Sequence, residues 1–135
     1  DLKREGDMKT PKGIFSIGNL YYRRDRNCKI ETKLKTVPIL QNMGWCDDTN
    51  SIKYNKLIKV NNKIKHERLY LKNNKYDLLI PIHYNMKPVI KNKGSAIFIH
   101  LTKNFKSTAG CIAISKKDFL ILLKIITPKT KIKID

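Results

Sequence analysis

The sequence predicts a domain built mainly from short β-strands, with one helix near its C-terminal end. Three observations lead to this prediction. The length of 135 residues suits a single hydrophobic core. Short runs of β-branched and aromatic residues alternate with turn residues, and one stretch close to the C-terminus has apolar residues at helical spacing. We therefore expect one domain over residues 1–135, with an N-terminal strand or leader missing if the chain begins inside a longer protein.

The first part of the chain contains two runs of β-type residues separated by turns. The runs are Ile14 to Ile17 and Leu20 to Tyr22, and turn residues such as Gly13 flank them. They suit strands of a small sheet. Residues 38–62 are loop-like and surround the only tryptophan, Trp45. A long irregular segment in a small domain often forms the wall of a site.

The middle of the chain contains the strongest strand signals. His66 to Leu71 suits a short helix or a turn, and Tyr76 to Tyr84 predicts a buried strand in which Pro81 indicates an edge or a bulge. Ser95 to Leu101 is the clearest strand, because its apolar residues are continuous and a glycine precedes them. This strand delivers His100 at its end.

The C-terminal part predicts one helix and one closing strand. Ser115 and Asp118 resemble a capping box ahead of apolar residues at helical spacing, which places the helix at about Lys116 to Ile126. Pro128 follows the end of this helix. The alternation over Lys131 to Ile134 predicts a strand with one buried face.

The charge of the chain is strongly positive. Lysine and arginine total 29 against 11 acidic residues, for a formal net charge of +18, so a polyanionic partner is one function class to test. The alternative is a coding bias toward lysine, because only five residues are arginine and the lysines lie along the whole chain. No stacking or phosphate-clamping pattern accompanies the charge, so we expect no nucleic-acid partner.

The chain has no predicted membrane span and no predicted metal site. Its longest apolar stretch, Phe119 to Ile126, is far shorter than the ~20 residues that cross a bilayer. Three cysteines and three histidines are scattered without metal-ligand spacing, so no metal or cofactor is expected. Cys28 and Cys46 could form a disulfide, which leaves one thiol free.

The third cysteine belongs to a possible catalytic group. His100 ends a strand, and Cys111 follows Gly110 a short loop later. Thiol catalysis needs a thiolate, an imidazole to take its proton, a group that fixes the imidazole tautomer, and amides that face the developing oxyanion. The alternative is that Cys111, ahead of Ile-Ala-Ile, is a small buried apolar residue.

A resemblance that covers nearly the whole chain favours catalysis. Short blocks occur in the same order as in the YkuD-type L,D-transpeptidases, and the chain resembles that family. The blocks are Lys3-Arg-Glu-Gly-Asp7, Thr10-Pro-Lys-Gly-Ile-Phe15, Gly44-Trp-Cys-Asp-Asp48, Tyr54-Asn55, Glu67-Arg-Leu69, Tyr76-Asp-Leu78, Tyr84-Asn85, Gly94-Ser-Ala-Ile-Phe-Ile-His100 and Thr108-Ala-Gly-Cys111.

The resemblance implies a fold and an activity. The fold is a mostly-β sandwich with one C-terminal helix and short extra helices, and the site lies at one edge of packed sheets. The activity uses no cofactor and acts on peptidoglycan stem peptides in the periplasm or cell envelope. A cysteine attacks the carbonyl of the third residue, releases D-alanine, and passes the acyl group to an amine of another stem in a 3-3 crosslink. No protein partner is implied.

The resemblance also implies roles for individual residues. Cys111 matches the nucleophile and His100 the general base. The backbone amides of Gly110 and Cys111 match the oxyanion hole. Leu101 and Ser107 are the two candidates to orient the histidine.

The chain departs from the commoner family signature at two positions. Ala109 stands where a second histidine precedes Gly-Cys, and Ala113 stands where an arginine follows the cysteine. A branch with Thr-x-Gly-Cys-x-Ala has this pattern, and its first residue, Thr108, is expected to contact the substrate. The two alanines leave an L,D-carboxypeptidase, which passes the same thioester to water, as the alternative activity.

Four further residues are candidates for substrate binding. Trp45 could line the peptide groove, with the acids of the following Asp47-Asp48 pair matching the amine of a diamino acid, or it could be a core residue. Arg4 could bind a substrate carboxylate or pair with an acid of its own turn. Tyr84 and Asn85 match a family position near the site, where Asn85 is expected to hold a loop by hydrogen bonds.

Overall fold

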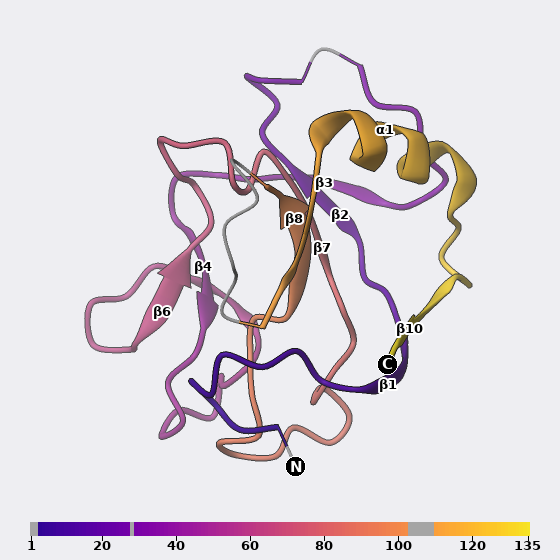
Figure 1. Cartoon of the computed structure of the whole chain (residues 1–135). Helices are drawn as coiled ribbons and strands as arrows, with labels where there is room; N and C mark the ends of the chain where they lie inside the picture. The colour runs from indigo at the N-terminus through magenta and orange to yellow at the C-terminus, as the bar shows by residue number, and fades with distance from the viewer. Residues whose placement is uncertain (1–2, 28, 103–109) are drawn as a thin grey trace.

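The computed structural model describes residues 3–27, 29–102 and 110–135. Within them the chain forms ten strands in three sheets and one helix, α1 (Lys116–Ile125). Figure 1 shows the strands spread across the molecule and α1 at its upper right. The predicted mostly-β fold with a helix near the C-terminus is confirmed. No helix in the described ranges has the length and apolar character that a membrane crossing requires.

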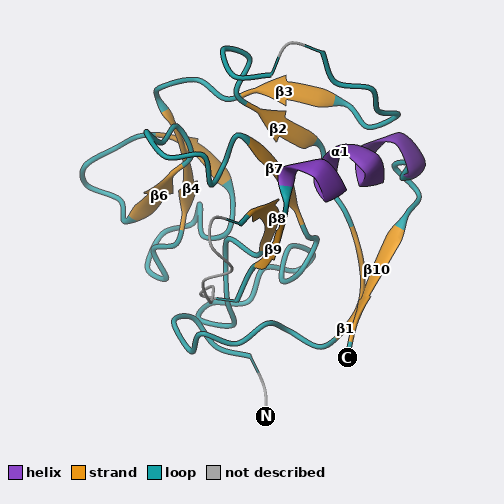
Figure 2. Cartoon of the chain, turned by 45° about the horizontal axis from the view of Figure 1, so that its top comes forward, coloured by secondary structure: helices purple, strands orange, loops and turns teal. Residues whose placement is uncertain are grey.

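A five-stranded sheet forms the centre of the domain (Figure 2). The outer pairs, β2 with β3 and β8 with β9, are parallel, and β7 pairs antiparallel with both β2 and β8. All of β7 and β8 is buried, because other elements cover both faces of the sheet. In spatial order the strands are β3 (Thr36–Pro38), β2 (Leu20–Tyr22), β7 (Leu78–Pro81), β8 (Phe98–Leu101) and β9 (Ile112–Ile114).

One face of this sheet packs against α1 and a two-stranded sheet. Ile80 and Ile99 point to this side and share a core with Phe119 and Leu123 of the helix. The two-stranded sheet consists of β1 (Gly13–Ser16) and β10 (Lys131–Ile134), whose apolar residues pack against the same core. Both of these strands are predicted by the sequence, although β1 pairs with the C-terminal strand and not with Leu20–Tyr22.

The opposite face packs against a three-stranded sheet. Here Leu79 and Phe98 share a second core with Trp45 and Tyr76. The strand order is β5 (Leu57–Lys59), β4 (Met43–Cys46) and β6 (His66–Arg68), with β4 antiparallel to both neighbours. Because side chains alternate along a strand, Phe98 and His100 both point to this second face.

The helix begins as its sequence predicts. The Ser115 hydroxyl accepts a hydrogen bond from the Asp118 amide at 3.1 Å, which caps the first turn. Phe119 and Leu123, one turn apart, are fully buried. The helix ends at Ile125, one residue earlier than predicted, and the Ile126 amide still donates to the Leu122 carbonyl.

Two segments differ from the sequence prediction because tertiary pairing overrides weak local signals. The 38–62 region, predicted as a loop, contains β4 and β5, which pair with each other. His66 to Leu71, predicted as a short helix or turn, instead begins with β6, because its backbone pairs with β4. Within the described residues α1 is the only helix, so the short extra helices are absent there.

Two strand predictions need correction in their limits. The predicted 76–84 strand is reduced to Leu78–Pro81, and it lies in the middle of the sheet, not at an edge. Pro81 is tolerated because it is the last residue of β7, where the pairing with β2 has already ended. The predicted 95–101 strand begins at Phe98, because Ala96 has a φ of 54° that strand geometry does not allow.

Candidate active site

The parallel pairing of β8 with β9 brings His100 and Cys111 to one face of the central sheet. Ile99 pairs with Ile112, so Cys111, one residue before β9, lies level with Phe98. Cys111 and His100 therefore point to the same side, and two strand residues span about 7 Å. That side is the one covered by the three-stranded sheet.

The His100 ring is buried and held through one of its two nitrogens. Its side chain is buried at 3% exposure, and its Nδ1 lies 2.8 Å from the Leu101 carbonyl oxygen. A carbonyl accepts only, so the Nδ1 carries the proton and the Nε2 keeps its lone pair. Among the described residues the buried Nε2 has no hydrogen-bond partner. Burial lowers the pKa of His100, so the ring is neutral and able to accept a proton at neutral pH.

Cys111 is a protonated thiol in this state. Its Sγ donates to the Ala96 carbonyl oxygen at 3.2 Å and accepts from the Phe98 amide at 3.4 Å. Burial raises the pKa of Cys111 to about 11, although the Phe98 amide acts in the opposite direction. A thiol with this pKa needs a base before it can act as a nucleophile at neutral pH.

The residue before Cys111 has to be glycine. Gly110 is buried with a φ of 103°, and a Cβ at this position would lie 2.6 Å from the Lys9 carbonyl oxygen. A side chain would therefore displace either the Gly110 turn or the N-terminal segment that crosses it. The close approach connects the first residues of the chain to the site.

Asn55 holds the backbone against which Cys111 is placed. Its side-chain oxygen accepts from the Trp45 indole at 2.9 Å and from the Ala96 amide at 3.2 Å. Its side-chain nitrogen donates to the Tyr84 and Asn85 carbonyl oxygens at 3.0 and 2.8 Å. Because Ala96 in turn accepts the Cys111 hydrogen bond, the Asn55 side chain positions the thiol indirectly.

Replacing Asn55 by alanine is expected to lower the free energy of unfolding by about 3 kcal/mol, because four hydrogen-bonding groups lose their buried partner. The φ of 58° at this position adds strain for alanine. Urea denaturation followed by tryptophan fluorescence measures the change. The exposed Asn62→Ala is the control and should stay within about 0.5 kcal/mol of the wild type. A loss below about 1 kcal/mol for Asn55→Ala would contradict this role.

The predicted substrate-binding residues divide between the core and the surface. Trp45 is 5% exposed and packs edge-on against Phe98 at 5.3 Å, as a core residue does. The side chain of Arg4 is exposed, and its backbone amide donates to Asp7, whose carboxylate pairs with Lys3 at 2.7 Å.

Tyr84 and Asn85 organise a loop. The Tyr84 hydroxyl donates to the Lys93 carbonyl oxygen at 2.5 Å. Asn85 donates to the Ile90 and Gly94 carbonyl oxygens, both at 2.9 Å, and accepts from the Ile90 amide at 2.7 Å. These contacts agree with the hydrogen-bonding role expected for Asn85. They also fix the 85–94 loop that leads into β8.

Several predicted residues fall elsewhere. Ser107, Thr108 and Ala109 lie outside the described residues. Of the two candidates to orient the histidine, Leu101 lies within the described residues, and its carbonyl oxygen contacts the His100 ring. Cys46 is a free thiol that is completely buried. Cys28, its partner in the suggested disulfide, lies outside the described residues.

The two acids after Trp45 have different surroundings. Asp48 accepts from the Asn50 amide at 3.0 Å and the Lys65 amide at 3.3 Å, as a turn residue does. Asp47 is half-buried, and its Oδ1 has no hydrogen-bond partner among the described residues. Burial, with the nearby Glu5 and Glu67, raises the pKa of the Asp47 carboxyl.

The site also contains residues to which the sequence analysis gave no role. Asn55, Glu67 and Tyr76 all stand in the family-like blocks, yet nothing in their local pattern shows that they surround the same histidine and cysteine. The sequence signal that could have pointed to these three residues is that they stand in those blocks. Their contacts become visible only when β4, β6 and β8 are placed together.

A neutral imidazole and a thiol on one face of a buried sheet are the two side chains that acyl transfer through cysteine requires. The chain matches the family model of the YkuD L,D-transpeptidase catalytic domain over residues 2–134, and it belongs to that family. Members are transpeptidases associated with the cell wall that act on peptidoglycan. The chain has no match among the curated proteins and none among the solved structures.

Proposed function

We propose that the chain is a peptidoglycan L,D-transpeptidase that uses Cys111 as its nucleophile. The donor is a tetrapeptide stem, the leaving group is its terminal D-alanine, and the acceptor is the side-chain amine of another stem. The product is a 3-3 crosslink, formed where the polymer lies, in the periplasm or cell envelope. Membership of the family supports the class of reaction, and the geometry around Cys111 supports the roles of the residues.

The single observation that carries this proposal is the state of His100. Its Nδ1–H is occupied by the Leu101 carbonyl, and its Nε2 is buried without a partner among the described residues, on the face that also presents the Cys111 thiol. A buried polar atom without a partner is costly unless a function needs it. Accepting the Cys111 proton is such a function.

The reaction begins when the thiol proton moves from its contact with the Ala96 carbonyl to the His100 Nε2. The Cys111 sulfur then forms a bond to the carbonyl carbon of the third stem residue, and the amides of Gly110 and Cys111 stabilise the oxyanion. When the tetrahedral intermediate collapses, the amide bond to D-alanine breaks. The protonated His100 gives its proton to the departing amine, which leaves an acyl-thioester on Cys111.

The acceptor amine completes the reaction. It attacks the thioester carbonyl, His100 takes its proton, and the Cys111 sulfur leaves and regains a proton. Asp47 is the candidate to attract the cationic amine of the diamino acid, because its half-buried carboxyl has an oxygen without a partner among the described residues. Water at the same position would give a tripeptide instead.

The test is mass spectrometry of a disaccharide-tetrapeptide, with a diamino acid as third residue, after incubation with the protein. The expected result is a dimer formed with loss of D-alanine, and no change with Cys111→Ala. Tripeptide without dimer would replace the transpeptidase with the L,D-carboxypeptidase, which Ala113 beside His100 in the sheet makes the second candidate. An unchanged substrate with the wild type would contradict both.

A further inference from the structure

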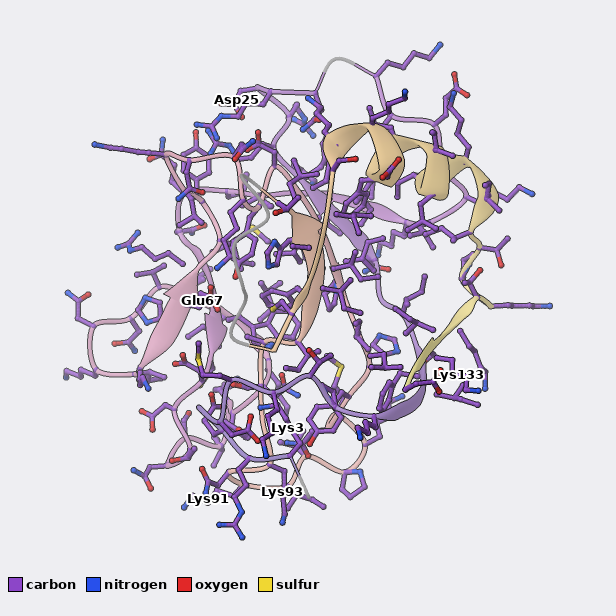
Figure 3. All side chains as sticks on the ribbon, in the orientation of Figure 1. Lys3, Asp25, Glu67, Lys91, Lys93 and Lys133 are labelled. Atoms are coloured by element: carbon purple, nitrogen blue, oxygen red, sulfur yellow. The ribbon has the colours of Figure 1, made fainter. Side chains whose placement is uncertain are left out.

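The ring of His100 rests on a tyrosine that is hydrogen-bonded to a glutamate. Tyr76 is 1% exposed, and its ring meets His100 edge-on with the centroids 5.5 Å apart. The Tyr76 hydroxyl donates to Oε1 of Glu67, a half-buried residue of β6. Figure 3 shows Glu67 between β6 and the central strands. Strand β6, the turn before β7 and the strand β8 therefore meet at the candidate base.

A lysine accompanies this pair. The Lys75 ammonium lies 3.6 Å from Glu67 Oε1 and 4.9 Å from the centre of the Tyr76 ring. The Lys75 carbonyl oxygen also accepts from the Leu101 amide at 3.1 Å, which ties the segment to the end of β8. Glu67 and Lys75 thus place opposite charges beside the same aromatic residue.

The proposed reaction creates a positive charge on a buried ring. In serine-protease-like triads a carboxylate bonded to the histidine stabilises the imidazolium. Here the Leu101 carbonyl occupies that position and supplies only a dipole. The oxyanion of the intermediate supplies one negative charge, and a carboxylate near the ring would stabilise the buried cation further.

We propose that Glu67, acting through Tyr76, is a positioning residue that holds the His100 ring and stabilises its protonated form during acyl transfer. This inference rests on the proposed function for its reaction. Its geometric basis is the continuous contact from the Glu67 carboxylate through the Tyr76 ring to the imidazole.

The charges that face the histidine act in opposite directions. The largest effects on the pKa of His100 are burial, which lowers it, and the Leu101 carbonyl, which raises it. Of the charged groups, Lys75 lowers this pKa and Glu67 raises it. At Cys111, Glu67 raises the pKa, whereas Lys75 and Lys3 lower it. Removing the charge of Glu67 should therefore lower the pKa of both His100 and Cys111, and removing the charge of Lys75 should raise the pKa of both.

The experiment compares Glu67→Gln with Lys75→Gln in the full 135-residue chain. Glutamine keeps an oxygen for the Tyr76 hydroxyl while it removes the charge, so a merely structural role would be preserved. We follow the His100 ring by NMR through a pH titration, and we measure kcat and KM for the tetrapeptide substrate. His83, whose Nδ1 lies 2.8 Å from the Ser16 hydroxyl oxygen, is the internal reference.

The expected result is a pair of opposed shifts. Glu67→Gln should lower the His100 titration midpoint by about half a pH unit, and Lys75→Gln should raise it by a similar amount. Glu67→Gln should also lower kcat about tenfold with KM within about twofold, because the stabilised cation exists only during the reaction. The His83 midpoint should not move.

Two outcomes would overturn the role of Glu67. One is a His100 midpoint that stays unchanged, or moves in the same direction, in both variants while the wild type turns over. The other is a loss of kcat in Glu67→Gln that merely follows a loss of folded protein. A third outcome separates the two proposals. If the two variants shift the His100 midpoint in opposite directions but neither they nor the wild type turn over substrate, the proposed function is contradicted and the electrostatic coupling of Glu67 to His100 is supported.

Discussion

Replacing Cys111 by alanine is expected to lower the rate of acyl transfer by at least about 10⁴-fold, because the substrate then has no nucleophile to attack it. The change removes one sulfur atom, and with it the hydrogen bonds to the Ala96 carbonyl and the Phe98 amide. The central sheet keeps its pairing through β8 and β9. The variant should therefore fold normally while it loses its activity.

The measurement combines D-alanine release with the intact mass of the protein during turnover. The wild type should carry the mass of one acylated stem, and Cys111→Ala should carry none. Cys28→Ala makes the same chemical change at a cysteine outside the motifs and should retain full activity. A Cys111→Ala protein that still released D-alanine, or still gained the acyl mass, would sink the assignment of the nucleophile.

Replacing His100 by glutamine is expected to lower kcat by about 10²- to 10⁴-fold at neutral pH, the range that a general base contributes. The reason is the Cys111 thiol, whose pKa of about 11 keeps it protonated without a base. As the pH rises toward that value, the thiol ionises without help. The defect of His100→Gln should therefore shrink at alkaline pH.

The wild-type pH profile supplies the complementary measurement. Because burial lowers the pKa of His100, kcat/KM should rise with pH along a limb whose midpoint lies below about 6.5, the ordinary value for histidine. That limb should vanish in His100→Gln. The control is His83→Gln, since His83 is exposed and its Nδ1 contacts the Ser16 hydroxyl. An unaltered limb in His100→Gln would show that another group is the base.

The local patterns in the sequence were sufficient for elements that form through short-range interactions. The helix at Lys116–Ile125 and its Ser115 cap follow from residues three or four positions apart. The alternation in Lys131–Ile134 marked β10 for the same reason. The strand that carries His100 and the glycine before Cys111 were likewise visible, and the order of the family-like blocks connected them to one chemistry.

Local patterns failed where long-range pairing decides the structure. β4, β5 and β6 have weak strand signals and form because their backbones pair across turns. Pro81 suggested an edge, yet β7 is the middle strand, because a proline at a strand end costs no ladder hydrogen bond once the neighbouring strand has ended. These errors share one cause, which is that the pairing partner lies outside any local window.

The candidate site shows the same difference between local patterns and long-range contacts. The sequence was enough to propose Cys111, His100 and Gly110 as the reacting group, because a nucleophile, a base and a tight turn each need a particular residue type. The tertiary structure alone decided that Leu101 fixes the imidazole tautomer, that Asn55 holds the backbone beside Cys111, and that Glu67 reaches His100 through Tyr76. Contacts of this kind depend on the register and packing of sheets whose strands are far apart in the chain, and a sequence pattern carries no distance between them.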